Sequence, residues 1–431
     1  MEPALLASFA AALVVFGVVS RRMERGVVSP PMVFVGLGIG LGQLGWLDSG
    51  RDLLSALAEL TLVVVLFTDA ARIDLARLRP QGSLPARLLG IGLPLTVATG
   101  ALAAWLILPG LGLWEAVLLG AVLAPTDAAL GQAVVSNRLV PANVRQSLNV
   151  ESGLNDGIAL PLVLVAIAFA GAAAESDELG RWVSFAVLQV TLGPLVGTVV
   201  GYLGGRSIER SVRAGWMNEP FQRLSVLGLA GVAFAGSELV GGNGFIGAFV
   251  SGLTLGNTAR SACTCAYEFG EAEGQLLSLV VFLIVGGVMV PAALPHWDYL
   301  VWLYALSSLS VVRMVPVALS LTRSGLRPAT VAFLGWFGPR GLASILYARI
   351  VVGEGLAISV LLESTVTLTV LLSTLLHGVT AYPLALRYGK RLAARRERAE
   401  EEHRPVSELP VRIRHAAGPA SPAWRATGNS A

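Results

Sequence analysis

The chain is built largely from apolar stretches that are each about as long as a membrane span. Of its 431 residues, 54% are hydrophobic and only 14% are charged, and the mean hydropathy is +0.70. A soluble chain carries about 25% charged residues. In lipid every backbone polar group needs a partner inside the protein, so only helices and closed barrels span a bilayer. The stretches have helical length, and they therefore predict an all-α, polytopic membrane protein.

Length and hydropathy divide the chain into about thirteen predicted spans. Their expected limits are 4–20, 29–47, 52–71, 86–107, 112–135, 146–171, 182–204, 221–240, 243–258, 272–294, 298–321, 329–351 and 358–385. From about residue 389 onward the composition changes to Arg, Glu, Pro and Ala. We therefore expect a transmembrane domain over 1–388 and a short cytoplasmic tail over 389–431, with a short helix followed by disorder.

Arginines between the predicted spans indicate the orientation. With the N-terminus outside, the outer connections contain Arg51 and Arg181, and the other arginines between spans fall on the inner side. The positive-inside rule therefore predicts an outer N-terminus and a cytoplasmic C-terminus. Arginines follow the first apolar stretch and do not precede it, which is the reverse of a cleavable signal peptide. The formal net charge of +3 comes mainly from arginine and gives no reason to expect nucleic acid as a partner.

Two predicted spans are interrupted at corresponding places. The first interruption is Ala-Pro-Thr-Asp (124–127) and the second is Gly-Trp-Phe-Gly-Pro-Arg-Gly (335–341). They lie seven spans apart, which makes them equivalent if the first six and the last six spans form inverted repeats. Paired discontinuous helices in matching positions mark the midplane binding site of a secondary transporter.

The run Glu-Ser-Gly-Leu-Asn-Asp (151–156) places polar side chains in the middle of an apolar helix. Ser152, Asn155 and Asp156 are spaced i, i+3 and i+4, so they share one helix face. Hydroxyl, amide and carboxylate oxygens suit a small hard cation, and a carboxylate also accepts a proton. Charge at membrane depth is functional by default. We expect Asp156 to bind either a cation or a proton, and competition at one site is sufficient for exchange.

The first interruption supplies further oxygens. Pro125 removes a backbone donor and breaks the helix, so the freed carbonyls and the Thr126 hydroxyl can face a cavity and coordinate an ion. Asp127 is expected near the N-terminus of a half-helix, where negative charge is favoured. It is either a structural partner of the helix dipole or an ion ligand.

Two arginines are expected at membrane depth. Arg340 lies in the second interruption, where a cation can neutralise the C-termini of half-helices. Arg313 lies within the span 298–321 and needs an anionic partner, for which Glu151 is the natural candidate.

These motifs together resemble the monovalent cation:proton antiporter family, NhaP type, over roughly residues 4–388. The resemblance rests on Ala-Pro-Thr-Asp-Ala (124–128), Glu-Ser-Gly-Leu-Asn-Asp-Gly (151–157), Gly-Asn-Gly-Phe-Ile-Gly-Ala-Phe-Val-Ser-Gly-Leu (242–253) and Gly-Pro-Arg-Gly-Leu-Ala-Ser (338–344). It implies an NhaA/NhaP-like fold with two crossed discontinuous helices. It also implies a homodimer, with core helices within about 86–171 and 298–385 and interface helices within about 4–71 and 221–294.

The resemblance also implies roles for individual residues. Asp156 would bind Na+ or a proton, Thr126 and Ser152 would coordinate the ion, Asn155 would support the site, Glu151 would pair with Arg313, and Asp127 and Arg340 would occupy the helix crossings. The Asn155-Asp156 pair resembles the electroneutral branch, in which one cation is exchanged for one proton.

Many relatives carry a glutamate after the Leu-Phe of the third span, whereas this chain continues with Thr68-Asp69. Either Asp69 takes the role of that glutamate, or that role is missing from this chain.

The expected function is sodium/proton antiport in the cytoplasmic (inner) membrane, with Li+ as a further cargo and no cofactor. Potassium/proton exchange stays open, because oxygen ligands do not reveal the radius that a site selects. A cation channel is less supported, because no repeated selectivity-filter segment is visible. An enzyme is not expected, because a catalytic metal site needs His or Cys ligands within the spans, and Cys263 and Cys265 lie in a connection.

Two further side chains have alternative interpretations. Glu363 is either buried in the last span or solvated at its outer end. His377 is either a pH sensor or a histidine whose polar atoms are simply satisfied.

Overall fold

The computed structural model describes residues 3–23, 26, 28–47, 51–75, 83–127, 129–174, 179–259 and 273–393, and the regular structure in these ranges is helical. The helices are α1 (Pro3–Met23), α2 (Pro30–Gln43), α3 (Arg51–Ala71), α5 (Ser83–Arg87), η2 (Leu88–Gly92), α6 (Leu93–Ile107), α7 (Leu113–Val122), α8 (Gln132–Val135), α9 (Ala142–Ala174), α10 (Leu179–Arg213), α11 (Glu219–Leu239), α12 (Gly244–Thr258), η3 (Val285–Met289), α14 (Val290–Ala293), η4 (Leu294–His296), α15 (Tyr299–Leu309), α16 (Val311–Ser320), α17 (Pro328–Trp336), α18 (Leu342–Gly353) and α19 (Ser359–Ala393). The expected disorder of the tail falls on 394–431, which lies outside the described residues, as do Cys263 and Cys265.

Helix occupies each stretch that hydropathy marks as a span. Within the described ranges, six helices are long and apolar enough to cross a membrane, namely Leu84–Ile107, Ala142–Ala173, Trp182–Arg213, Glu273–His296, Tyr299–Ser320 and Ser359–Leu392. Shorter apolar helices are Leu6–Ser20, Pro30–Gln43, Leu113–Val122 and Leu342–Gly353. The prediction of an all-α, polytopic membrane fold is confirmed.

Helix α10 is longer than the span predicted for it. The expected segment ends at 204, whereas the helix continues to Arg213. Its extra turns are polar, and Arg213 Nη2 lies 2.6 Å from Glu209 Oε1 one turn before it. Such i, i+4 pairs support a helix in water. Hydropathy reports only the apolar part of a helix, so the polar continuation was missed.

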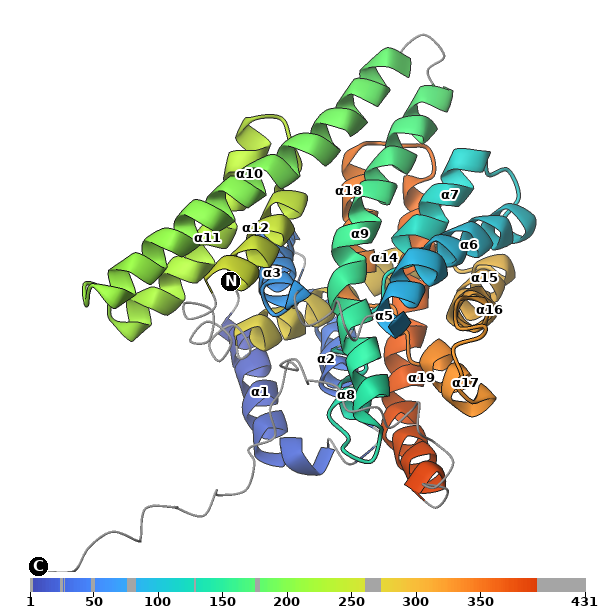
Figure 1. The fold of residues 1–431 in the computed structure, drawn as a ribbon. Coiled ribbons are helices and arrows are strands. Elements are labelled where there is room, and N and C mark those ends of the chain that lie inside the picture. The colour runs from blue at the N-terminus through green and yellow to red at the C-terminus, as the bar shows by residue number, and fades with distance from the viewer. Residues whose placement is uncertain are drawn as a thin grey trace, which may run out of the picture.

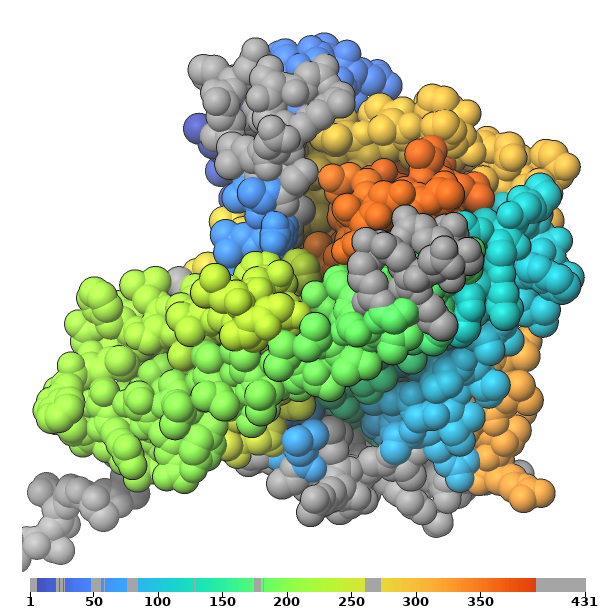
Figure 2. All heavy atoms as spheres, turned by 90° about the horizontal axis from the view of Figure 1, so that it is seen from above, coloured from blue at the N-terminus to red at the C-terminus, as the bar shows by residue number. Residues whose placement is uncertain are grey.

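The helices form two packed groups that meet along α9 (Figure 1). In the first group, α12 packs against α3, α10 and α11. In the second, α7 packs against α6 and α9, α16 against α6 and α17, and α19 against α15 and α18. Figure 2 shows the yellow-green atoms of α10–α12 on one side of the molecule and the cyan and orange atoms of α6, α7 and α15–α18 on the other. Helix α9 contacts members of both groups, including α7 and α10.

Two helices are interrupted, as the sequence predicts. The first leaves helical geometry after Val122 and resumes at Gln132, and the second stops at Trp336 and resumes at Leu342. The first interruption is wider than the predicted run 124–127. The backbones of the two interruptions are hydrogen-bonded to each other: the Asp127 amide donates to the Pro339 carbonyl at 2.8 Å. A hydrogen bond across the crossing thus replaces one within the helix.

Close backbone packing joins α12 to α3. A Cβ atom added at Gly252 would collide with the carbonyl oxygen of Phe67, and one added at Gly256 would collide with that of Ala71. The two glycines lie one helical turn apart, so together they form a smooth strip against α3. Small residues allow this close approach between helices in a membrane.

This contact predicts the effect of adding a methyl group. Gly252→Ala should lower the free energy of unfolding by about 1–3 kcal/mol, because a rigid carbonyl occupies the space that the methyl group needs. Gly231→Ala in α11 is the matched control, since nothing lies within 4 Å of its added Cβ. Thermal unfolding of the purified protein in detergent measures both. Equal midpoints for the two variants would contradict the packing described.

Candidate functional site

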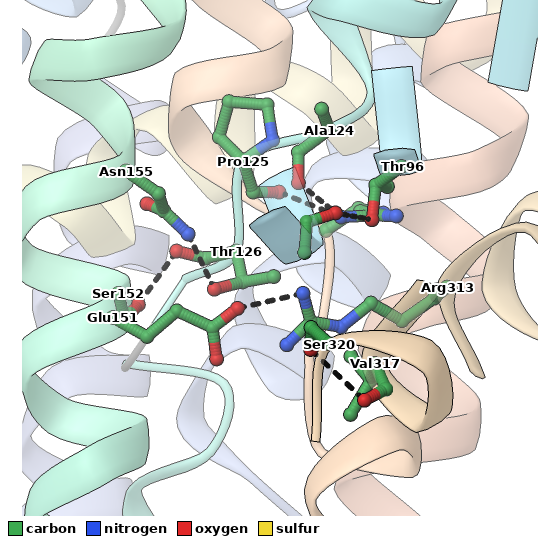
Figure 3. A network of polar contacts seen from close by, with 12 residues as sticks. Thr96, Ala124, Pro125, Thr126, Glu151, Ser152, Asn155, Arg313, Val317 and Ser320 are labelled. Atoms are coloured by element: carbon green, nitrogen blue, oxygen red, sulfur yellow. Dashed lines mark hydrogen bonds and ion pairs between the residues drawn. The ribbon is translucent and has the colours of Figure 1, made fainter. Parts of the chain in front are cut away.

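The extended stretch after α7 lies against the polar face of α9. Ser152 Oγ donates to the Thr126 carbonyl at 2.6 Å, and Asn155 Nδ2 donates to Thr126 Oγ1 at 2.6 Å (Figure 3). Both donors come from the same face of α9, and Asp156 follows Ser152 on that face by one turn. The structure thus brings three of the predicted site residues, Thr126, Ser152 and Asn155, into direct contact and places Asp156 one position further along α9.

These groups differ in their access to solvent. Thr126, Ser152 and Asn155 are buried, with 4%, 7% and 1% of their surface exposed, whereas Asp156 is half-buried. The buried Asn155 Oδ1 has no hydrogen-bond partner within the described part of the chain. A half-buried acidic residue next to buried oxygens is suited to bind a cation or a proton.

Tyr347 of α18 is a contact that the sequence interpretation missed. Its hydroxyl donates to the backbone carbonyl of Asp156 at 2.6 Å, and its side chain is fully buried. This bond attaches the turn of α9 that carries Asp156 to the second interrupted helix. A buried tyrosine hydroxyl usually has a partner, so a tyrosine within the apolar α18 was the available signal.

Asp127 stabilises the N-terminus of α18. Its Oδ2 accepts from the Leu342 amide at 3.1 Å, and its Oδ1 accepts from the Ala129 amide at 2.8 Å. Leu342 is the first residue of α18. A Cβ atom at Gly341 would collide with this carboxylate, so glycine allows the approach. The sequence left Asp127 as either a structural partner of the helix dipole or an ion ligand. This geometry favours the structural partner of the dipole.

Arg340 stabilises the C-terminus of α7, on the other interrupted helix of the crossing. Its guanidinium is fully buried, and its Nη1 donates to the carbonyls of Ala124 and, at 3.2 Å, of Pro125. These carbonyls lie just beyond the C-terminus of α7. A positive charge is favourable there because it faces the negative end of the helix dipole.

Glu151 and Arg313 form a buried ion pair between α9 and α16. Arg313 Nη1 lies 2.6 Å from Glu151 Oε1, and the two side chains are 2% and 3% exposed (Figure 3). A Cβ atom at Gly338 would collide with the Arg313 guanidinium, so the second interruption also packs against this pair. The pair therefore connects α9 to the second interruption through α16.

The remaining candidates are Asp69, Glu363 and His377. Asp69 is half-buried in α3, which packs against α9 and α12. Glu363 Oε1 lies 3.1 Å from Arg349 Nη1, with 28% of the Glu363 side chain and 46% of the Arg349 side chain exposed, as expected for a partly solvated position. His377 is buried, and both of its ring nitrogens have hydrogen-bond partners.

Comparisons with known proteins agree with the fold. The chain matches a protein of known structure, the sodium proton antiporter MjNhaP1 from Methanocaldococcus jannaschii, with a TM-score of 0.73 and 19% sequence identity, over 90% of this chain and 98% of that one. It is 26% identical over 380 residues to the "K(+)/H(+) antiporter NhaP" of Alkalimonas amylolytica. It is also 27% identical over 268 residues to the "Na(+)/H(+) antiporter 2" of Zygosaccharomyces rouxii, covering 58% of this chain and 32% of that one.

The match to the Alkalimonas protein covers 86% of this chain but only 64% of that relative. The family described as "Sodium/hydrogen exchanger, transmembrane" matches residues 8–387, nearly the whole membrane part. This family consists of transporters, which agrees with the expectation that the chain is not an enzyme. The family match also confirms the resemblance carried by the sequence motifs. The chain therefore belongs to the transmembrane sodium/hydrogen exchanger family.

Proposed function

We propose that the chain exchanges a monovalent cation for a proton by binding the two in turn at Asp156. The observation that carries this proposal is the placement of Asp156 on the face of α9 whose Ser152 and Asn155 contact Thr126 at the helix crossing. Sodium is the proposed cation, with lithium as a second cargo. Potassium is a second candidate, favoured by the name of the Alkalimonas relative.

The proposed cation ligands are Asp156, Ser152 and Thr126. Ser152 Oγ–H occupies one lone pair of the Thr126 carbonyl, and Asn155 occupies one lone pair of the Thr126 hydroxyl. Carbonyl and hydroxyl oxygens each have two lone pairs, so both Thr126 oxygens and the Ser152 hydroxyl retain capacity for an ion. Hydrogen bonds within the site thus hold the oxygens in place and still leave each oxygen a lone pair for the ion.

Charge balance supports electroneutral exchange. The crossing and α9 bring together the carboxylates of Glu151, Asp127 and Asp156 and the guanidiniums of Arg313 and Arg340. Three carboxylates and two guanidiniums leave one negative charge. One monovalent cation or one proton at Asp156 neutralises it, and a net buried charge is costly at this depth. We therefore infer that one cation is exchanged for one proton.

Exchange requires access to Asp156 from each side of the membrane in turn. We infer that the core helices, within about 86–171 and 298–385, move as a unit against the helices within about 4–71 and 221–294. Rocking of one helix group against another around a midplane site is the usual form of alternating access. We further infer a homodimer formed through the second group, in the cytoplasmic (inner) membrane, with the N-terminus outside and the C-terminus in the cytoplasm.

Asp156→Asn should abolish exchange, because an amide carries no charge to balance a cation and releases no proton. Cation-dependent proton flux in proteoliposomes should fall to that of protein-free liposomes. Glu219→Gln is the control and should retain flux, because Glu219 is a largely exposed carboxylate in the first turn of α11. Sodium-dependent flux in the Asp156→Asn protein would contradict the proposal, provided that both variants insert equally.

The same proteoliposomes distinguish the candidate cargoes. We expect sodium and lithium to drive proton flux over a range of pH values and potassium to drive little. A potassium response at least as large as that of sodium would assign the chain to potassium/proton exchange. A lack of response to all three cations would contradict antiport altogether.

The buried ion pair predicts strong coupling between its two members. Glu151→Gln or Arg313→Met alone should destabilise the protein by about 3–5 kcal/mol, because each leaves one buried charge without its partner. The double variant should be far more stable than the sum of the two losses implies, because it buries neither charge. A double-mutant cycle in thermal or denaturant unfolding measures this coupling. Additive losses would show that the pair does not interact.

A further inference from the structure

Two side chains of α19 contact both ends of the second interruption. Ser373 Oγ accepts from the Arg340 amide at 2.7 Å, and His377 Nε2 lies 2.9 Å from the Trp336 carbonyl. Trp336 is the last residue of α17, and Arg340 lies two residues before α18. Ser373 and His377 are spaced i, i+4 on one face of α19. We call this pair the α19 clip.

Both ring nitrogens of His377 take part in the clip. The Trp336 carbonyl can only accept, so His377 Nε2 donates to it. Nδ1 lies 3.2 Å from Ser373 Oγ and 3.0 Å from the Ser373 carbonyl. Ser373 thus contacts both the Arg340 amide and the His377 ring. A continuous chain of hydrogen bonds runs from Arg340 through Ser373 and His377 to Trp336.

The clip is buried and is reinforced by Trp336. Ser373 and His377 are 0% and 1% exposed. The Trp336 ring centroid lies 5.1 Å from that of His377, and its Nε1 donates to Thr380 Oγ1 of α19 at 3.0 Å. Helix α19 therefore holds the end of α17 through both the backbone and the side chain of Trp336.

Arg340 connects the clip to the proposed cation site. Its backbone amide is bound by Ser373, while its guanidinium holds the carbonyls of Ala124 and Pro125. The next residue, Thr126, contacts Ser152 and Asn155 of α9. A shift of the Arg340 backbone would therefore alter the position of the Thr126 oxygens.

We propose that Ser373 and His377 are positioning residues for cation exchange, which fix Arg340 and, through it, the oxygens of Thr126. This inference rests on the proposed function, because it assigns the clip a role in that exchange. The two side chains act through Arg340 and do not contact the transported ion. Their loss should therefore weaken cation affinity more than the maximal rate.

Four variants of the full-length protein separate the parts of this proposal. Ser373→Ala removes the partner of the Arg340 amide, and His377→Asn is too short to reach the Trp336 carbonyl. His377→Gln places an amide donor near the position of Nε2, so it should restore the bond to Trp336. Thr374→Val is the matched control, because the buried Thr374 hydroxyl has no hydrogen-bond partner among the described residues.

The readouts are the apparent KM for sodium in proteoliposomes and hydrogen–deuterium exchange of the peptide covering 336–342. Ser373→Ala and His377→Asn should raise the KM about fivefold, the effect of losing one hydrogen bond, with a smaller change in maximal rate, and should accelerate amide exchange. His377→Gln and Thr374→Val should resemble the wild type in both. A KM and an amide-exchange rate in His377→Gln that match the wild type would show that the hydrogen bond to Trp336, and not the volume of the ring, is what the exchange requires.

Two different failures can be distinguished. Unchanged KM and amide exchange in Ser373→Ala and His377→Asn, with an active wild type, would overturn the clip and leave the exchange function intact. A wild type that transports no monovalent cation would instead overturn the proposed function, and with it the role of the clip in exchange.

Discussion

The crossing of the two interrupted helices depends on charges that satisfy their exposed backbone ends. Asp127, from the first interruption, accepts from the first amide of α18, and Arg340, from the second, donates to the carbonyls beyond α7. Each interruption therefore supplies the charge that the other requires. Extended backbone at membrane depth is tolerated only when protein groups satisfy it, so neither interruption is stable without its partner.

This crossing determines where the binding chemistry lies. Pro125 ends the helical hydrogen bonding, and the next residue presents its carbonyl and hydroxyl to Ser152 and Asn155 of α9. The ion pair between Glu151 and Arg313 attaches the same part of α9 to α16. Because all of these contacts converge on one short segment of α9, the position of Asp156 is defined by the crossing rather than by its own helix alone.

Much of this arrangement could be predicted because polar residues stand out in an apolar chain. Helix geometry alone places Ser152 and Asp156 on one face. A proline followed by polar residues predicts the first interruption, and a proline set among glycines predicts the second. The helix end that Asp127 caps could not be predicted, because it depends on which half-helix lies opposite. Tyr347 and Ser373 were missed for a related reason, since single hydroxyls are ordinary in membrane helices and only the fold shows which backbone groups they meet.

The most direct test of the account is the number of protons released when a cation binds. Purified protein in weakly buffered detergent solution, titrated with sodium, should release one proton per bound cation at a pH where Asp156 is protonated. The Asp156→Asn protein should release none. Sodium binding without proton release in the wild-type protein would contradict competition between cation and proton at a single carboxylate.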